Sequence, residues 1–183
     1  MDDRFAWAKL QINVGLANTV EDIDRNVEYA LTRDYTPFQA LLDTEKGAAS
    51  VVGSGPSLLK NWEKLRDSKT DIFACNASCQ FLLSKGVVPK YMFCFDADPL
   101  MLEFITPHPD ITYLISSRCP PKAFDMLEGC KIVLWHTAGD EHIDEILEKH
   151  NKVEAIVIGG SAAVTRCIVL ARAIGYDMIH MWG

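Results

Sequence analysis

A glycine- and serine-rich segment, Gly53-Ser54-Gly55-Pro56-Ser57, directly follows an apolar run in this sequence of 183 residues. Two glycines allow a tight turn and a close approach of the backbone to a ligand. Pro56 suits the first position of a helix, whose free N–H groups attract anions. We therefore predict that the segment binds phosphate, with an ordinary strand-to-helix turn as the alternative. Leu58 replaces the third glycine of the dinucleotide motif, and the lysine of a P-loop is also missing.

Two carboxylates, Asp96 and Asp98, follow another apolar run. Carboxylates hold Mg²⁺ against phosphate oxygens, so both are candidate catalytic residues. Asp98 precedes Pro99 and could instead cap a helix, which makes Asp96 the candidate metal ligand. Asn76 follows a third apolar run and either caps a helix or binds a ribose or a base through its amide.

Other polar residues stand at equivalent places later in the chain. Ser116 and Arg118 follow one run, and Arg118 is either a catalytic clamp for a phosphate or an exposed loop residue. His136 ends the next run and either contacts the ligand or has a structural role. Gly159-Gly160-Ser161 forms a second glycine-rich turn, in which Ser161 would cap a helix. The two glycine-rich turns together could hold both ends of a phosphorylated ligand.

Alternating strands and helices position these residues. Each polar segment follows one of seven apolar runs that we predict to be strands, and the segments between the runs have helical spacing. The alternation predicts an α/β fold, a Rossmann-like open and mainly parallel sheet with helices on both faces. In such sheets ligands bind beyond the carboxyl ends of the strands. The predicted strands are Ala49–Val52, Asp71–Cys75, Tyr91–Phe95, Ile111–Ser116, Lys131–His136, Ala155–Ile158 and Met178–Trp182.

Two regions differ in character. Residues 1–47 predict a helical lead-in of two amphipathic helices, and the second starts at Asn18-Thr19 with Asp22 as a capping-box acid. Residues 35–47 are expected to form a mixed connector around Pro37, and the segment is not among the predicted strands. Residues 48–183 predict the nucleotide-binding domain. Within it, the helix from Ser161 to Ile174 is apolar almost all round and predicts a buried central helix.

Composition narrows the class of protein. The formal net charge of −7 disfavours binding to nucleic-acid polymers, which need a basic surface. No apolar run reaches the ~18 residues of a membrane span, and the N-terminus does not have the pattern of a secretory signal. The six cysteines form no C-x-x-C pair, which predicts buried, reduced thiols in a cytoplasmic protein. We expect a small-molecule nucleotide as partner and leave a homo-oligomer open.

The order of these motifs resembles the 6-hydroxymethylpterin diphosphokinase-like family, which includes the flagellar motility accessory factors. The resemblance covers residues 48–183. The residues that carry this resemblance are Gly53-Ser54-Gly55-Pro56-Ser57-Leu58, Asn76, Gly86-Val87-Val88-Pro89 before the strand that leads to Asp96, Gly159-Gly160-Ser161 and Leu170-Ala171-Arg172-Ala173-Ile174-Gly175-Tyr176. The glycine turn and Asn76 alone also look like those of bacterial CMP-sialic-acid-dependent sialyltransferases.

The diphosphokinase resemblance implies a transferase that uses ATP and Mg²⁺ to add a diphosphate to a pterin-type alcohol. The first glycine turn would then bind phosphates, Asp96 would hold the metal, and Gly160 and Ser161 would complete the nucleotide cleft. The sialyltransferase resemblance implies instead a metal-free site in which Asn76 and the glycine turn hold CMP. The motility accessory factors imply a third role, the handling of a sugar nucleotide for protein glycosylation.

Two further alternatives stay open at this point. In the resembling families the last strand is followed by an acidic residue and more chain, whereas this sequence stops at Gly183. A truncated or non-catalytic nucleotide-binding module is therefore an alternative to a complete enzyme. An NAD-dependent dehydrogenase is disfavoured, because the glycine pattern and the spacing to the next acidic residue are unsuitable for a dinucleotide.

Overall fold

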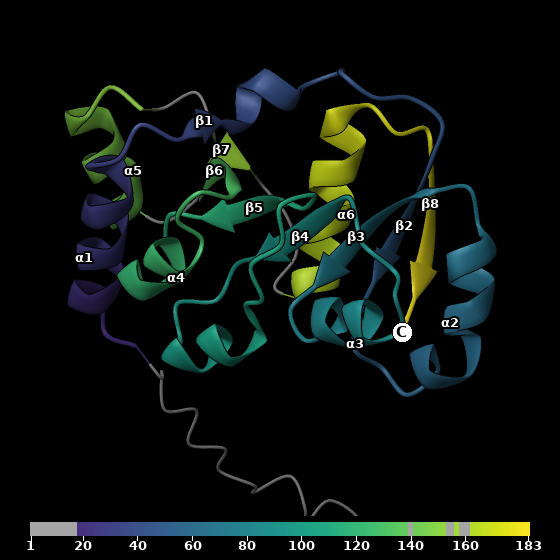
Figure 1. The fold of residues 1–183 in the computed structure, drawn as a ribbon. Coiled ribbons are helices and arrows are strands. Elements are labelled where there is room, and N and C mark those ends of the chain that lie inside the picture. Colours follow the sequence, from purple (N-terminus) through teal and green to yellow (C-terminus); the bar gives the residue numbers. More distant parts are fainter. Residues whose placement is uncertain (1–17, 139–140, 153–155, 158–161) are drawn as a thin grey trace, which may run out of the picture.

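The computed structural model describes residues 18–138, 141–152, 156–157 and 162–183. Within them, eight strands run parallel, in the order β1-β6-β5-β4-β3-β2-β8, with β7 paired to β6 (Figure 1). This is the predicted open α/β sheet of Rossmann-like type. The strands are β1 Thr36–Pro37, β2 Ala48–Val52, β3 Asp71–Cys75, β4 Tyr91–Cys94, β5 Thr112–Ser116, β6 Lys131–Thr137, β7 Ile156–Val157 and β8 Met178–Trp182.

Helices cover both faces of the sheet. One face packs against α1, α2, α3, α4 and the 3-10 helix η3, and the other packs against α6 and the 3-10 helix η2. Because helices cover each central strand on both faces of the sheet, apolar side chains point to both faces. The helices are α1 Val20–Leu31, η2 Phe38–Leu41, α2 Leu58–Asp67, α3 Ser78–Ser84, η3 Pro99–Phe104, α4 Pro121–Met126, α5 Glu141–Lys149 and α6 Ala163–Ile174.

The predicted start of α1 is confirmed. Thr19 is the N-cap and forms a capping box with Asp22: each side chain accepts a hydrogen bond from the backbone N–H of the other residue. The apolar side of α1 packs against α5, where Val27, Ile143 and Leu147 are fully buried. The first predicted helix lies outside the described residues.

Three predictions about elements need correction. Residues 35–47 contain a strand, β1, which pairs with β6. The helix predicted from Ser161 begins at Ala163 and is not buried all round, because Thr165, Val169 and Arg172 are exposed on its outer side. Strand β8 is not covered on both faces either. It is an edge strand, and the side chains of Met178 and Met181 are 58% and 67% exposed.

A charged cluster joins several elements at the amino ends of the strands. The ammonium group of Lys90 lies 2.7 Å from Glu45 Oε1 and 2.7 Å from Asp71 Oδ2, and the hydroxyl of Tyr176 donates to the same Asp71 oxygen. Burial raises the pKa of Asp71, but the hydrogen bonds from Lys90 and Tyr176 outweigh it, and the pKa is lowered overall. The cluster fixes the connector before β2 to the sheet.

The six cysteines are all free, and all except the half-buried Cys130 are buried, as predicted. Burial raises the pKa of the Cys79 thiol to about 12, which keeps it protonated and unreactive at neutral pH. Across the described residues, none of the helices has the length and apolar character required to cross a membrane.

Candidate functional site

The path of the chain creates a crevice between β2 and β8. From β2 the strands follow one another outward to β6, and α6 then carries the chain back to β8 on the other side of β2. In open α/β sheets, ligands bind beyond the carboxyl ends of the strands at the point where the strand order reverses. An open cleft of ≈ 390 Å³ lies at this place, lined by Gly53, Ser54, Gly55, Val164, Met181, Trp182 and Gly183.

The predicted glycine turn forms one wall of this cleft, and its glycines are required by close contacts. A Cβ atom on Gly53 would lie 2.9 Å from Cγ2 of Val164, and one on Gly55 would collide with the backbone of Gly183. The N–H of Gly53 donates to the carbonyl of Trp182, at 2.8 Å. The turn is therefore held against β8 and against the start of α6.

The serines and the proline of the turn differ from the prediction in detail. Helix α2 begins at Leu58, so Pro56 belongs to the preceding turn and does not occupy the first helical position. The hydroxyl of Ser57 does not cap the helix and donates to the carbonyl of Gly183. Ser54 is exposed at the cleft.

Asn76 follows β3, beside the glycine turn. It adopts a left-handed conformation, with φ of 51°, which asparagine tolerates better than most residues. It does not cap α3, because the N-cap is Ala77 and no side-chain capping bond is formed. The backbone N–H of Asn76 donates to the carbonyl of Phe93, but its side-chain amide forms no hydrogen bond within the described chain and is available to a ligand.

The two aspartates after β4 have different roles. One oxygen of Asp98 accepts from the N–H of Leu100 at 2.9 Å and caps η3, so the structure supports the capping interpretation for this residue. Oδ1 of Asp96 accepts from the N–H of Asp98 at 3.1 Å, and its side chain is exposed. Over the ranges that the structure describes, no three His, Cys, Asp or Glu side chains gather into a metal site.

The polar residues after β5 and β6 are partly used by the fold. Ser116 is buried and its Oγ accepts from the N–H of Arg118 at 3.4 Å. His136 is 2% exposed, and its Nδ1 lies 2.8 Å from the hydroxyl of Ser117. Gly159, Gly160 and Ser161 lie outside the described residues.

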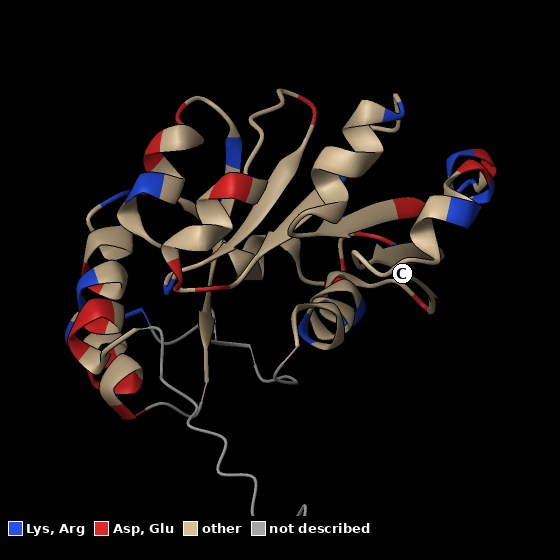
Figure 2. Ribbon diagram, turned by 90° about the horizontal axis from the view of Figure 1, so that it is seen from below, with Lys and Arg blue, Asp and Glu red and all other residues tan. Residues whose placement is uncertain are grey.

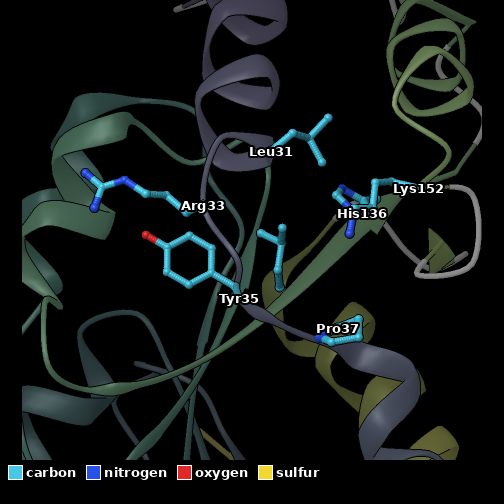
Figure 3. Close-up of a pocket in the computed structure, with 7 residues that line it drawn as sticks. Leu31, Arg33, Tyr35, Pro37, His136 and Lys152 are labelled. Atoms are coloured by element: carbon cyan, nitrogen blue, oxygen red, sulfur yellow. The ribbon is translucent and has the colours of Figure 1, made fainter.

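His136 faces a different part of the molecule from the glycine cleft. Figure 3 shows its ring beside Leu31 and Lys152, in a cavity that also involves Arg33, Tyr35 and Pro37. This cavity has a volume of ≈ 20 Å³. A space of that size holds about one water molecule, whereas sites for small organic ligands measure about 300–1,000 Å³. We therefore place the candidate site at the glycine cleft and the neighbouring strand ends.

A second cluster lies farther along the same edge, and it contains residues that the sequence did not reveal. The guanidinium groups of Arg118 and Arg166 lie 5.5 Å and 4.4 Å from the ring centre of Phe95. Arg166 comes from α6 and also lies 5.9 Å from the ring centre of Trp135. The sequence signal for Arg166 was its charge within a mostly apolar helix, a signal that it shares with Arg172.

Charge elsewhere is concentrated on the outer helices. Figure 2 shows acidic and basic residues interspersed on the helices at both ends of the sheet, while the strands carry few charged residues. The edge brings together the glycine turn, Asn76, Asp96 and Arg118, which follow β2, β3, β4 and β5 in that order, and Arg166 reaches it from α6. It does not bring His136 to the cleft.

The chain belongs to the family described as "6-hydroxymethylpterin diphosphokinase MptE-like", which residues 21–183 match. This confirms the family inferred from the motifs, and it extends the match to α1 and β1. None of the curated protein sequences compared with this chain matches it.

A solved structure shares the fold. The MAf glycosyltransferase from Magnetospirillum magneticum AMB-1 superposes with a TM-score of 0.67 at 19% sequence identity. The match covers 97% of this chain but 29% of that one, so this chain spans less than a third of the neighbour's length. At this level of identity the likeness concerns the fold.

Proposed function

We propose that this chain is the nucleotide-binding part of a transferase, and that it moves diphosphate from ATP to a pterin-type alcohol. The glycine-lined cleft between β2 and β8 carries the proposal, because it lies where the sheet reverses and has the volume of a small-ligand site. Family membership supports the diphosphate reaction. Backbone N–H groups of the glycine turn would bind phosphates, and the Asn76 amide would bind the sugar or the base.

Asp96 fits a magnesium ion in part. Its carboxylate is exposed, and one of its oxygens is free of hydrogen bonds to the described chain. Mg²⁺ commonly takes one or two protein carboxylates and fills its other positions with water and substrate phosphates. Asp96 would hold the ion, which would neutralise phosphate charge. The acceptor alcohol would approach from solvent.

A sugar-nucleotide transferase is the second candidate. The shared fold with a MAf glycosyltransferase favours it, and so does the free amide of Asn76 beside the glycine turn. This candidate binds CMP or a CMP-linked sugar without metal. The two proposals thus differ in nucleobase and in their need for Mg²⁺.

A thermal-shift panel tests both proposals. ATP, GTP, CTP, CMP and CMP-sialic acid are added with and without Mg²⁺. A ligand at about 100 times its Kd stabilises the folded state by about 2.7 kcal/mol, which corresponds to a rise in Tm of about 5–10 °C for a chain of this size. A shift with ATP only in the presence of Mg²⁺ supports the diphosphokinase, and a metal-independent shift with CMP supports the glycosyltransferase.

Two variants with matched controls locate the ligand. Asn76→Ala should abolish the shift, whereas Asn151→Ala should keep it, because Asn151 has the same left-handed conformation in the turn after α5. Asp96→Asn should abolish only the magnesium-dependent part, with the exposed Asp110→Asn as control. If no nucleotide shifts the Tm of the unmodified chain, the proposed function is wrong.

A further inference from the structure

We propose that a cavity between α1 and the turns after β4 and β5 binds the acceptor of the transferase, a flat heterocycle with N–H and carbonyl groups along its edge. The inference rests on the proposed function for the reaction that this acceptor undergoes, and it places the acceptor outside the glycine cleft. We name this cavity the acceptor pocket. It is lined by Asn18, Asp22, Arg25, Asn26, Ala97, Pro99, Pro120 and Pro121.

The acceptor pocket has the size of a small ring system. Its volume is ≈ 240 Å³, whereas the open glycine cleft has ≈ 390 Å³. Sites for drug-sized ligands measure about 300–1,000 Å³, and a water molecule takes about 30 Å³ of liquid water. The pocket is therefore large enough for a fused pair of rings and suits a ligand smaller than a nucleotide.

The pocket has a polar wall and an apolar wall, and the two come from different elements. Its four polar residues lie in α1 and directly before it, whereas the turns after β4 and β5 contribute one alanine and three prolines. Proline fixes the backbone, so the apolar wall is already rigid before a ligand binds. A flat heterocycle has apolar faces and a polar edge, and it matches both walls.

Asn26 gives the polar wall a hydrogen-bond acceptor that the fold does not use. Its side chain is 4% exposed, and its Nδ2 donates to the carbonyl of Arg118 at 2.9 Å. Its Oδ1 accepts no hydrogen bond from the residues that the structure describes, and this oxygen is not fully enclosed. Buried amides normally satisfy both of their ends. The unused oxygen therefore indicates a ligand that donates an N–H group.

Two charged residues complete the polar wall. Asp22 accepts hydrogen bonds from Arg25 at 2.7 Å and from Thr19, and the backbone N–H of Thr19 lowers the pKa of this carboxyl. The ionised carboxylate can accept further N–H groups, and the Arg25 side chain, which is 69% exposed, has further N–H groups for a carbonyl. A pterin-type ring carries amino, N–H and carbonyl groups on one edge, and this wall offers a partner for each of them.

The pocket adjoins the candidate metal ligand. Asp96 directly precedes Ala97, and the turn after β4 is two strands from the glycine turn, about 10 Å at about 4.8 Å per strand. The phosphates of a nucleotide on the glycine turn would extend along this edge of the sheet toward Asp96. An alcohol that enters the pocket from solvent would meet them there with its hydroxyl group.

Fluorescence titration with 6-hydroxymethylpterin, whose ring is itself fluorescent, tests the pocket. The protein is titrated alone and in the presence of α,β-methylene-ATP and Mg²⁺. We expect Asn26→Ala and Arg25→Ala each to weaken pterin binding by about fivefold or more, because each leaves a polar group of the ligand without its partner. Two controls should leave binding unchanged: Asn151→Ala in the turn after α5, and Arg66→Ala, which removes an arginine that pairs with a neighbouring aspartate on α2.

The outcomes separate this inference from the proposed function. Pterin binding that is weakened in both pocket variants but in neither control supports the acceptor pocket, even if no nucleotide shifts the Tm. Pterin binding that is unchanged in both pocket variants overturns the pocket, and nucleotide binding in the same protein leaves the proposed function intact. Absence of pterin binding to the unmodified chain under both conditions also overturns the pocket. Urea unfolding shows whether Asn26→Ala folds without its bond to Arg118, and if it does not, the exposed Arg25→Ala decides.

Discussion

Two aspartates separated by one residue contribute differently at the end of β4. One oxygen of Asp98 accepts a hydrogen bond from the N–H of Leu100, so Asp98 is the N-cap of η3, and Pro99 occupies the first helical position. Asp96 is exposed, and its Oδ1 holds only the neighbouring backbone N–H. The sequence Asp-x-Asp-Pro predicts both a cap and a ligand, and local hydrogen bonding assigns the cap to the aspartate before proline.

At the same scale, Asp71 should make stability depend on pH. Its pKa is lowered in the folded protein, so its contribution is present above the unfolded pKa of about 3.9 and is lost as pH falls through the folded value. We expect Asp71→Asn to lower the free energy of unfolding at pH 7 and to reduce its decline between about pH 5 and pH 2. Urea unfolding at several pH values measures both effects.

Asp34→Asn is the control for this experiment, because Asp34 is exposed and forms no ion pair with the described residues. It should keep both the stability at pH 7 and the full acid dependence of the unmodified chain. If Asp71→Asn and Asp34→Asn behave alike, the cluster around Lys90 does not stabilise the fold.

At the scale of elements, the link between α6 and β8 depends on one glycine. Gly175 ends α6 with φ of 120°, and the preceding residues accept hydrogen bonds from the connector: Asp43 N–H to Ala173 and Glu45 N–H to Ile174. A Cβ on Gly175 would collide with the carbonyl oxygen of Glu45. This contact places β8 beside β2 and so shapes the cleft.

Gly175→Ala should therefore destabilise the protein by more than backbone strain alone. Gly129 supplies the comparison, because it also has positive φ, 83°, but open space around its Cβ position. We expect Gly129→Ala to cost about 1 kcal/mol and Gly175→Ala to cost about 2 kcal/mol or more, measured by urea unfolding. If both variants lose the same free energy of unfolding, the connector at Glu45 moves away from the new Cβ without an energetic cost.

At the scale of the whole molecule, residues 18–47 are packed into the sheet domain. Val27 and Ala30 of α1 are fully buried, Phe38 of η2 joins the core beneath α6, and β1 extends the sheet beside β6. The change in sequence character at residue 48 is therefore not a boundary between independently packed units in this part of the chain.

Removal of residues 1–47 should accordingly abolish cooperative folding. A chain of residues 48–183 would expose the apolar side of α5 and the core beneath η2. We expect it to show no cooperative transition in urea when followed by near-ultraviolet circular dichroism, whereas residues 18–183 unfold cooperatively. A cooperative transition of residues 48–183 at the same midpoint as the longer chain would contradict this.

Much of the fold follows from local pattern. Each of the seven apolar runs overlaps with a strand in the structure, and α1 starts where Thr19 and Asp22 predict it. Both features could be predicted because capping and periodic burial depend on residues close in sequence. Strand β1 was missed, because two residues that include Pro37 have no apolar periodicity and become a strand only by pairing with β6.

The sequence by itself determined the α/β class, and it predicted Gly53, Asn76 and Asp96 as candidate site residues at the strand ends. Only the tertiary structure decided that α6 carries the chain back to β8 beside β2, that His136 faces away from the cleft, and that Arg166 meets Arg118 over Phe95. The reason is physical: a turn or a cap is set by neighbours along the chain, whereas two charges on separate elements meet only when packing of the whole sheet brings those elements together.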